Sequence, residues 1–164
     1  MPVNLRPPSG APTPDARLYL KEDELDRAVE LLFAAARRFA QTAQPTLAAR
    51  GLGPAHYRAL AAIRRSEGLP VSGLRETLGV RKQSLARVLD ELEAAGLITR
   101  APGAEDRRER RLHLSAEGRD IEAEITTALR DRLAGVFRAC GAEAVIGARS
   151  VWAALAETGA EDDS

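Results

Sequence analysis

The chain has 164 residues, enough for one compact domain or for a small lobe with helical surfaces that a second subunit covers. It carries 24 basic and 24 acidic residues, and the resulting net charge of zero excludes a polycation that binds acidic partners without specificity. Its single cysteine, Cys140, excludes an intramolecular disulfide and a zinc site of several cysteines. No apolar run approaches the roughly 18 residues that span a bilayer, and the N-terminus has no apolar signal core. We therefore expect a cytoplasmic protein without a membrane partner.

The N-terminal part divides into a proline-rich arm and a helix. Residues 1–17 contain five prolines and few apolar residues, which predicts a flexible arm. The alternative is an arm that packs on a partner subunit or reaches DNA. Apolar residues then recur at helical spacing from Leu20 to Ala49, which predicts a long amphipathic helix. Pro45 should kink or split this helix, because proline removes a backbone hydrogen bond.

Two shorter helices and a third, longer one follow. Pro54 suits the first turn of a helix that reaches about residue 66, and residues 67–70 should form a loop. Ser72 is a candidate N-cap for a short helix that ends at Leu78 before Gly79. A longer helix should cover residues 81–95, with Gly96 just past its C-terminal end.

The last part of the chain predicts a β-hairpin and two helices. Residues 97–100 and 111–114 have strand character, and the polar residues 101–110 should connect them. Ser115 can cap a long helix that breaks at Cys140 and Gly141, and a final helix follows. The fold class is therefore mainly α with a small β-hairpin. The apolar faces of the first and last helices need a partner, which is either a second subunit or the central lobe.

Residues 71–97 have the organisation of a helix-turn-helix, with a short helix, a tight turn and a second helix. Apolar residues along one face of the second helix should pack on the domain. The opposite face is polar at its start, where such a helix meets base edges in the major groove. The candidate DNA-binding residues of this region are Arg75, Arg81, Lys82, Gln83, Ser84 and Arg87. Any soluble helix has a polar face, so these residues alone also fit an ordinary solvated surface.

The hairpin loop strengthens the DNA-binding interpretation. Four of the five residues from position 107 to 111 are arginine, which is dense for an ordinary turn. Guanidinium groups suit phosphate contacts and narrow minor grooves. Arg107, Arg108 and Arg110 are therefore candidate DNA-binding residues, while Asp106 and Glu109 are expected to hold the arginines in place.

The stretch from about Pro54 to Gly118 resembles the MarR family of winged helix-turn-helix transcriptional regulators. The resemblance rests on Tyr57-Arg58-Ala59-Leu60, on the run from Leu85 to Arg100, and on a wing with Asp-x-Arg before a Leu-x-Leu-Ser element. Here Asp106 and Arg108 take the first two places, and Leu112, Leu114, Ser115 and Gly118 follow at the family's spacing. The chain departs from the family at Arg81, where a small capping residue is usual, and at Arg75, which follows Leu74 in place of alanine.

The resemblance implies a homodimer that binds double-stranded DNA at a near-palindromic operator, with Arg108 in the minor groove. The corresponding domains are the arm at 1–17, an N-terminal dimerisation helix at 18–53, a winged helix-turn-helix lobe at 54–114, C-terminal dimerisation helices at 115–158 and an acidic tail at 159–164. The resulting hypothesis is a dimeric repressor. The alternative is a winged-helix module that binds an acidic protein partner and no specific DNA.

The resemblance also implies a small anionic or aromatic effector that binds between the dimerisation helices and the lobe. Candidates to line such a pocket are Tyr19, Phe33, Arg37, Arg38, Phe39 and Tyr57. Ordinary packing of these side chains is the alternative, so no ligand residue is assigned.

Neither catalysis nor a cofactor has support in the sequence. His56 and His113 are far apart in the chain, which disfavours a metal site, and we expect none. No catalytic triad order, phosphate-binding loop or paired carboxylate motif is present, so we expect no enzyme activity. Cys140 follows Val136 and Phe137, and we expect it to be a buried structural residue.

Overall fold

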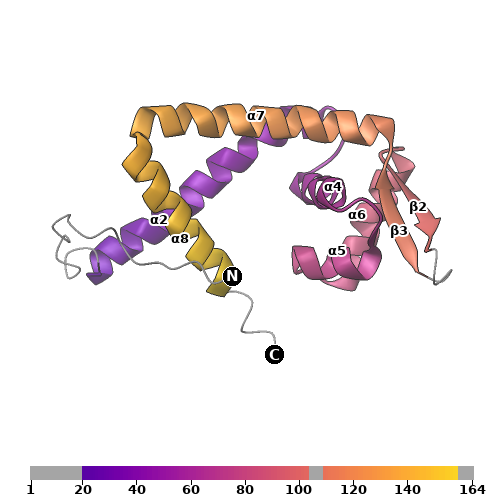
Figure 1. The fold of residues 1–164 in the computed structure, drawn as a ribbon, viewed down its shortest axis with the longest axis horizontal. Helices are drawn as coiled ribbons and strands as arrows, with labels where there is room; N and C mark the ends of the chain where they lie inside the picture. Colours follow the sequence, from indigo (N-terminus) through magenta and orange to yellow (C-terminus); the bar gives the residue numbers. More distant parts are fainter. Residues whose placement is uncertain (1–19, 104–108, 159–164) are drawn as a thin grey trace. The chain divides into compact units, whose positions relative to one another are not determined.

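The computed structural model describes residues 20–103 and 109–158 and is mainly helical with a small antiparallel sheet (Figure 1). The chain forms two compact units, one of residues 37–131 and one that combines residues up to 36 with residues from 132 onward. In the described ranges, no helix is both long enough and apolar enough to cross a membrane. The helices and the small antiparallel sheet confirm the predicted fold class, mainly α with a β-hairpin.

The N-terminal helical region is divided where proline requires it. Helix α2 (Glu22–Ala40) is followed by a 3-10 turn, η1 (Gln41–Ala43), and by the short α3 (Gln44–Ala48). Pro45 stands in the first turn of α3, where its missing N–H would have no partner in the helix. The predicted split at this proline is therefore confirmed, and it begins in the turn before Pro45.

The larger unit is built around helices α4, α5 and α6. Helix α4 (Pro54–Arg65) contacts both α5 (Val71–Leu78) and α6 (Lys82–Ala94). The core beneath them consists of fully buried aliphatic side chains, which supply most of the favourable free energy of folding. It includes Leu47, Leu60, Ile63, Leu74, Leu89, Leu92, Leu97, Ile98, Leu112, Ile121 and Ile125.

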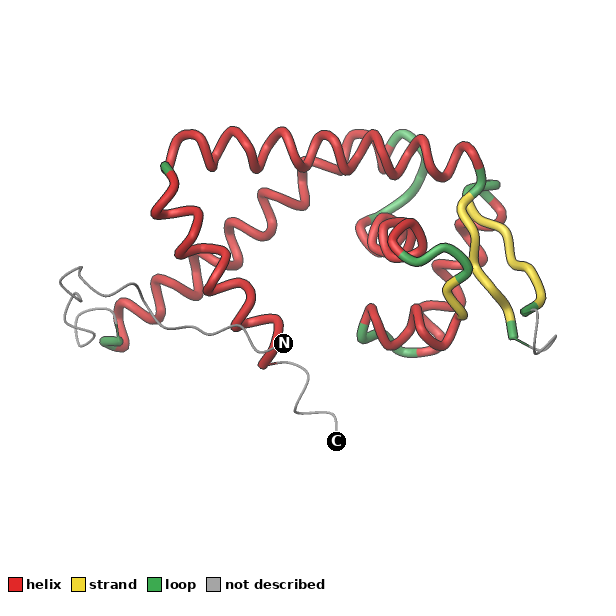
Figure 2. The backbone as a smooth tube through the Cα atoms, viewed as in Figure 1, coloured by secondary structure: helices red, strands yellow, loops and turns green. Residues whose placement is uncertain are grey.

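The sheet of this unit has the strand order β1-β3-β2 (Figure 2). Strands β2 (Ile98–Pro102) and β3 (Arg110–Leu114) form the predicted hairpin, with Ile98 opposite Leu114 and Pro102 opposite Arg110. The predicted loop from 101 to 110 was too long, because pairing extends to Pro102 and begins again at Arg110. The prediction of a plain loop at 67–70 was also wrong, since β1 (Leu69–Pro70) pairs with β3. Two paired residues give no alternating pattern that a sequence could reveal.

Helix ends follow local chemistry, with one correction. Helix α6 is followed by Gly96, whose φ of 71° is the left-handed conformation expected after a helix end. The N-cap of α5 is Pro70 and not the predicted Ser72, and no side chain caps this helix. Pro70 already adopts the extended backbone of a cap residue, so helix α5 starts one residue before Ser72.

Helices α7 (Ala116–Cys140) and α8 (Ala142–Thr158) complete the chain. The Ser115 hydroxyl accepts a hydrogen bond of 2.9 Å from the Gly118 N–H, which confirms the predicted cap of α7. Gly141, with a φ of 81°, separates α7 from α8 at the predicted position. In the unit that holds α8, Phe137 stacks on Trp152 with ring centroids 6.2 Å apart.

Candidate nucleic-acid interface

The turn between α5 and α6 has the geometry that a helix-turn-helix requires. Gly79 has a φ of 58°, and its N–H donates to the Glu76 carbonyl at 3.2 Å. Leu74 on α5 and Leu85 on α6 are buried in the same core. These contacts fix α6 on the lobe and leave its other face in solvent.

The polar face at the start of α6 is exposed. Arg81, Lys82, Gln83 and Ser84 are all exposed, and within the part of the chain that the structure describes their side chains form no hydrogen bond or ion pair. Arg81 is the N-cap residue but supplies no side-chain cap. The first turn therefore presents backbone N–H groups and cationic side chains together, which is the combination that binds phosphate oxygens.

Two further candidates lie on the same unit. Arg75 is exposed on α5, and Arg110 is exposed at the first position of β3. Arg107, Arg108 and the supporting residue Asp106 lie outside the described residues. The structure thus places seven of the predicted side chains on the surface of one unit, namely Arg75, Arg81, Lys82, Gln83, Ser84, Arg87 and Arg110.

The base of the hairpin loop is held by an ion pair. Glu109 lies 2.8 Å from the Arg111 guanidinium, which also donates to the Gly68 carbonyl at 3.2 Å. Arg111 therefore joins the hairpin to the loop before β1. The Arg111 side chain thus has two partners in the protein, whereas that of Arg110 has none among the residues that the structure describes.

Arg87 differs from the other α6 cations because it has a partner. Its Nε donates to Glu91 Oε1 at 2.8 Å, and the second carboxylate oxygen of Glu91 lies 2.7 Å from His56 Nε2. The hydrogen bond from Arg87 and then the one from His56 hold the pKa of Glu91 below its ordinary value. The same bond to Glu91 raises the pKa of Arg87. Sequence reasoning missed Glu91 and His56, although the i,i+4 spacing of Arg87 and Glu91 is a visible signal.

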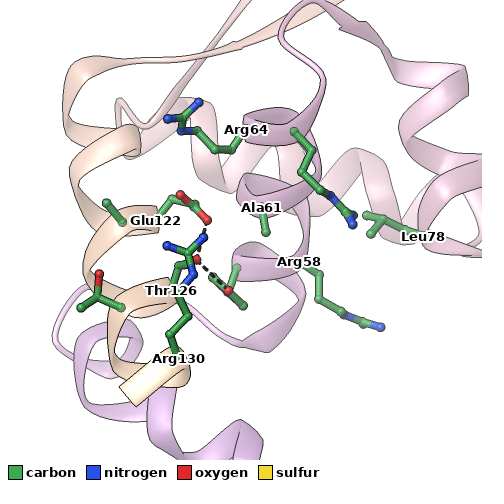
Figure 3. Close-up of a pocket in the computed structure, with 11 residues that line it drawn as sticks. Arg58, Ala61, Arg64, Leu78, Glu122, Thr126 and Arg130 are labelled. Atoms are coloured by element: carbon green, nitrogen blue, oxygen red, sulfur yellow. Dashed lines mark hydrogen bonds between the residues drawn. The ribbon is translucent and has the colours of Figure 1, made fainter. Parts of the chain in front are cut away.

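A pocket of about 680 Å³ lies in the same unit between α4, the end of α5 and α7 (Figure 3). Its cations outnumber its anions, because Arg58, Arg64, Arg65 and Arg130 line it with the single carboxylate Glu122. The other lining residues are Tyr57, Ala61, Leu78, Ala123, Thr126 and Thr127. Figure 3 shows Glu122 and Thr126 on α7 facing Ala61 on α4.

The wall of the pocket is ordered by a chain of hydrogen bonds. Tyr57 and Thr126 share a hydrogen bond of 3.0 Å between their hydroxyls, and Glu122, although buried, accepts from Thr126 at 2.6 Å. Because the Thr126 hydroxyl gives its single proton to Glu122, the Tyr57 hydroxyl is the donor to Thr126. The polar atoms of Glu122 are thus partly satisfied from within the wall.

Of the predicted pocket residues that the structure describes, only one lines this pocket. Tyr57 does so, while Phe33 and Phe39 are exposed and Tyr19 lies outside the described residues. Arg37 and Arg38 are also exposed away from the lining set. The arginines on α4 were missed, although positions 57, 58, 61, 64 and 65 follow one helical face.

Cys140 is exposed, so its predicted burial was wrong. It is the last residue of α7, directly before the glycine that ends the helix. At such a position few side chains of the same chain surround the thiol, and neighbouring apolar residues in sequence do not guarantee burial.

Comparison with known proteins identifies the family. The model of the MarR family matches residues 50–109, which include α4, α5, α6 and β2 and end one residue before β3. The HTH-type transcriptional regulator PetP of Rhodobacter capsulatus is 40% identical over 147 residues, which cover 90% of this chain and 89% of that protein.

Solved structures share the fold. A crystal structure of MarR is 26% identical and superposes with a TM-score of 0.68 over 79% of this chain and 88% of that one. A MarR mutant from E. coli in complex with operator DNA is 20% identical, with a TM-score of 0.66 over 81% of this chain and 96% of that one. Sequence and structure together place this chain in the MarR family of transcriptional regulators.

Proposed function

We propose that the protein is a sequence-specific DNA-binding regulator in which α6 enters the major groove and the hairpin reaches the adjacent minor groove. The observation that carries this proposal is the start of α6, where four exposed polar residues have no partner among the described residues and lie at a helix end without a side-chain cap. Arginine reads guanine and glutamine reads adenine through paired hydrogen bonds, while lysine and serine suit phosphates. Membership of a family of transcriptional regulators and the fold shared with an operator-bound relative support the same function.

The proposal extends to a homodimer acting as a repressor on a near-palindromic operator. The lobe at 54–114 is assigned to DNA, and the helices at 18–53 and 115–158 to dimerisation. Large apolar side chains on α2 and α8, including Phe33, Ile146 and Leu155, are exposed in the single chain. A second subunit would cover such surfaces, and two lobes related by a twofold axis would address two half-sites.

Arg108 provides the test of the wing assignment. Replacing Arg108 with alanine removes one cation from the minor groove region, so the affinity for the DNA upstream of the gene should fall by roughly tenfold. The salt dependence of binding should also become flatter by about 0.9 in the slope of log affinity against log salt, because one fewer counterion is released. Fluorescence anisotropy titrations at several salt concentrations measure both quantities.

The control is Arg27→Ala on α2, which removes an equal charge from an exposed side chain outside the lobe. This variant should leave the affinity and the slope unchanged. Equal behaviour of the two variants would contradict the wing assignment and would favour the alternative, a winged-helix module for an acidic protein partner.

We also propose that the arginine-lined pocket binds a small anionic effector that lowers the affinity for DNA. The support is its composition, with four arginines against one carboxylate and with Tyr57 as an aromatic wall. The pocket lies between α4 and α7, and α4 contacts α6 directly. A ligand that draws its walls together would therefore act on the helix assigned to DNA.

Aromatic carboxylates such as benzoate test the effector proposal. Benzoate should weaken DNA binding severalfold in the wild-type protein and much less in Arg130→Gln, which removes one pocket cation. Arg119→Gln is the matched control, because Arg119 lies on the same helix and pairs with Glu67 outside the pocket. A response to benzoate that is equal in all three proteins, or absent from all three, would contradict the assignment of this pocket.

A further inference from the structure

His56 occupies an unusual position, since both of its ring nitrogens have defined partners. The Gly53 N–H, at the N-cap of α4, donates to His56 Nδ1 at 2.9 Å. A backbone N–H is only a donor, so Nδ1 must carry a lone pair, and the proton of the neutral ring is then on Nε2. That proton points to Glu91 Oε2, which lies 2.7 Å from His56 Nε2. His56 is therefore a donor to Glu91, which lies on a different helix.

Glu91 connects His56 to Arg87 through its two carboxylate oxygens. One carboxylate oxygen accepts from buried His56 and the other accepts from Arg87 Nε at 2.8 Å, one turn earlier on α6. The carboxylate is thus fixed at one end by a side chain of the α4 N-terminus. Arg87 is the most exposed of these three residues, with 82% of its side chain accessible.

The geometry leaves Arg87 free to act at its far end. Only Nε is used by Glu91, so the two terminal nitrogens still present four N–H donors. A guanidinium held through Nε loses less conformational freedom when it binds, which raises affinity for a target at one fixed place. Arg87 follows Lys82, Gln83 and Ser84 by one turn on the polar side of α6.

We infer that His56 and Glu91 are positioning residues that hold Arg87 in a fixed orientation for reading sequence. This inference rests on the proposed DNA-binding function. It assigns a role in specificity to two residues that do not themselves need to touch DNA. Because Glu91 is also an anion near the DNA surface, its removal has two opposite effects. Any duplex binds more tightly without the negative charge, whereas the correct duplex loses a preoriented arginine.

The measured quantity is therefore the specificity ratio, which is the affinity for an operator selected from random DNA divided by the affinity for a scrambled duplex of the same composition. His56→Asn retains an acceptor for the Gly53 N–H, since the asparagine oxygen stands where Nδ1 does, but it is too short to reach Glu91. His56→Gln retains a donor at the distance of Nε2. We expect His56→Asn and Glu91→Ala to lower the ratio by roughly three- to tenfold, and His56→Gln to stay close to wild type.

Arg87→Ala separates positioning from a general structural effect. If His56 acts through Arg87, the change His56→Asn has no further effect on the ratio in the Arg87→Ala background. An equal loss in both backgrounds, or an unchanged ratio in His56→Asn and Glu91→Ala, would overturn the inference. Glu91 is exposed, so Glu91→Ala gives this answer even if the His56 variants fold poorly.

Failure of the underlying function has a different signature. A wild-type protein that binds the selected and the scrambled duplex equally would overturn the proposed function and this inference with it. A wild-type ratio well above one with ratios unchanged in both single variants would overturn the inference alone.

Discussion

Gly118 is the residue on which the junction between the sheet and α7 depends. A Cβ atom at this position would lie 2.0 Å from the Leu97 carbonyl oxygen, which is far inside the contact distance of the two atoms. The same carbonyl accepts a hydrogen bond from the Ser115 N–H at 3.0 Å. Backbone is on both sides of the contact, so no flexible side chain can move aside.

Gly118→Ala should therefore destabilise the protein, although alanine favours a helix more than glycine does. We expect a loss of about 1–3 kcal/mol in the free energy of unfolding, the usual range for overpacking. Gly135→Ala in the same helix is the control, because a Cβ there meets no atom within 4 Å and should stabilise the helix by up to about 1 kcal/mol. Urea unfolding of both variants measures the difference. A Gly118→Ala protein as stable as the wild type would contradict the close approach.

Residue-scale features differ in how well the sequence predicts them. The Ser115 cap could be predicted because the hydroxyl and the N–H that it binds are three residues apart. The steric role of Gly118 could not, since it depends on contact with Leu97, which lies in the turn between α6 and β2. The His56–Glu91 bond joins residues 35 positions apart and was missed for the same reason.

At the scale of elements, the sequence predicted the boundaries that glycine and proline set locally. It did not predict the boundaries that depend on tertiary contacts. Glycine before and after α6, and proline in α3, mark these helices because the backbone constraints of both residues act locally. Strand β1 was missed because its two residues are a strand only through pairing with β3. The hairpin was predicted, but its loop was too long, since pairing at Pro102 and Arg110 adds to both strands.

The candidate interface could be predicted from the sequence, whereas the pocket could not. The exposed face of α6 follows from the positions of its apolar residues along a single helix, so its polar members could be predicted. The pocket requires α4 and α7, whose lining residues are separated by more than 50 positions in sequence. Helical spacing places the arginines of α4 on one face but does not say what that face meets.

At the scale of the whole molecule, the two units of the chain differ in how they bury apolar surface. The unit of residues 37–131 has a closed core of buried aliphatic side chains. The other unit keeps large apolar side chains exposed on α2 and α8, for example Val29, Ile146 and Trp152. Large apolar side chains left exposed in this number are a usual mark of an interface between protein molecules. The proposed homodimer accounts for it and supplies two lobes to one DNA duplex.

Selection of duplexes from a random pool by the full-length protein tests this account most directly. We predict enrichment of a near-palindromic sequence with two half-sites about 10 base pairs apart, or a multiple of that spacing, because each lobe of a twofold dimer meets one major groove. The mass of the complex in sedimentation should correspond to two chains on one duplex. A pool that shows no enrichment, or a single half-site bound by one chain, would contradict the account.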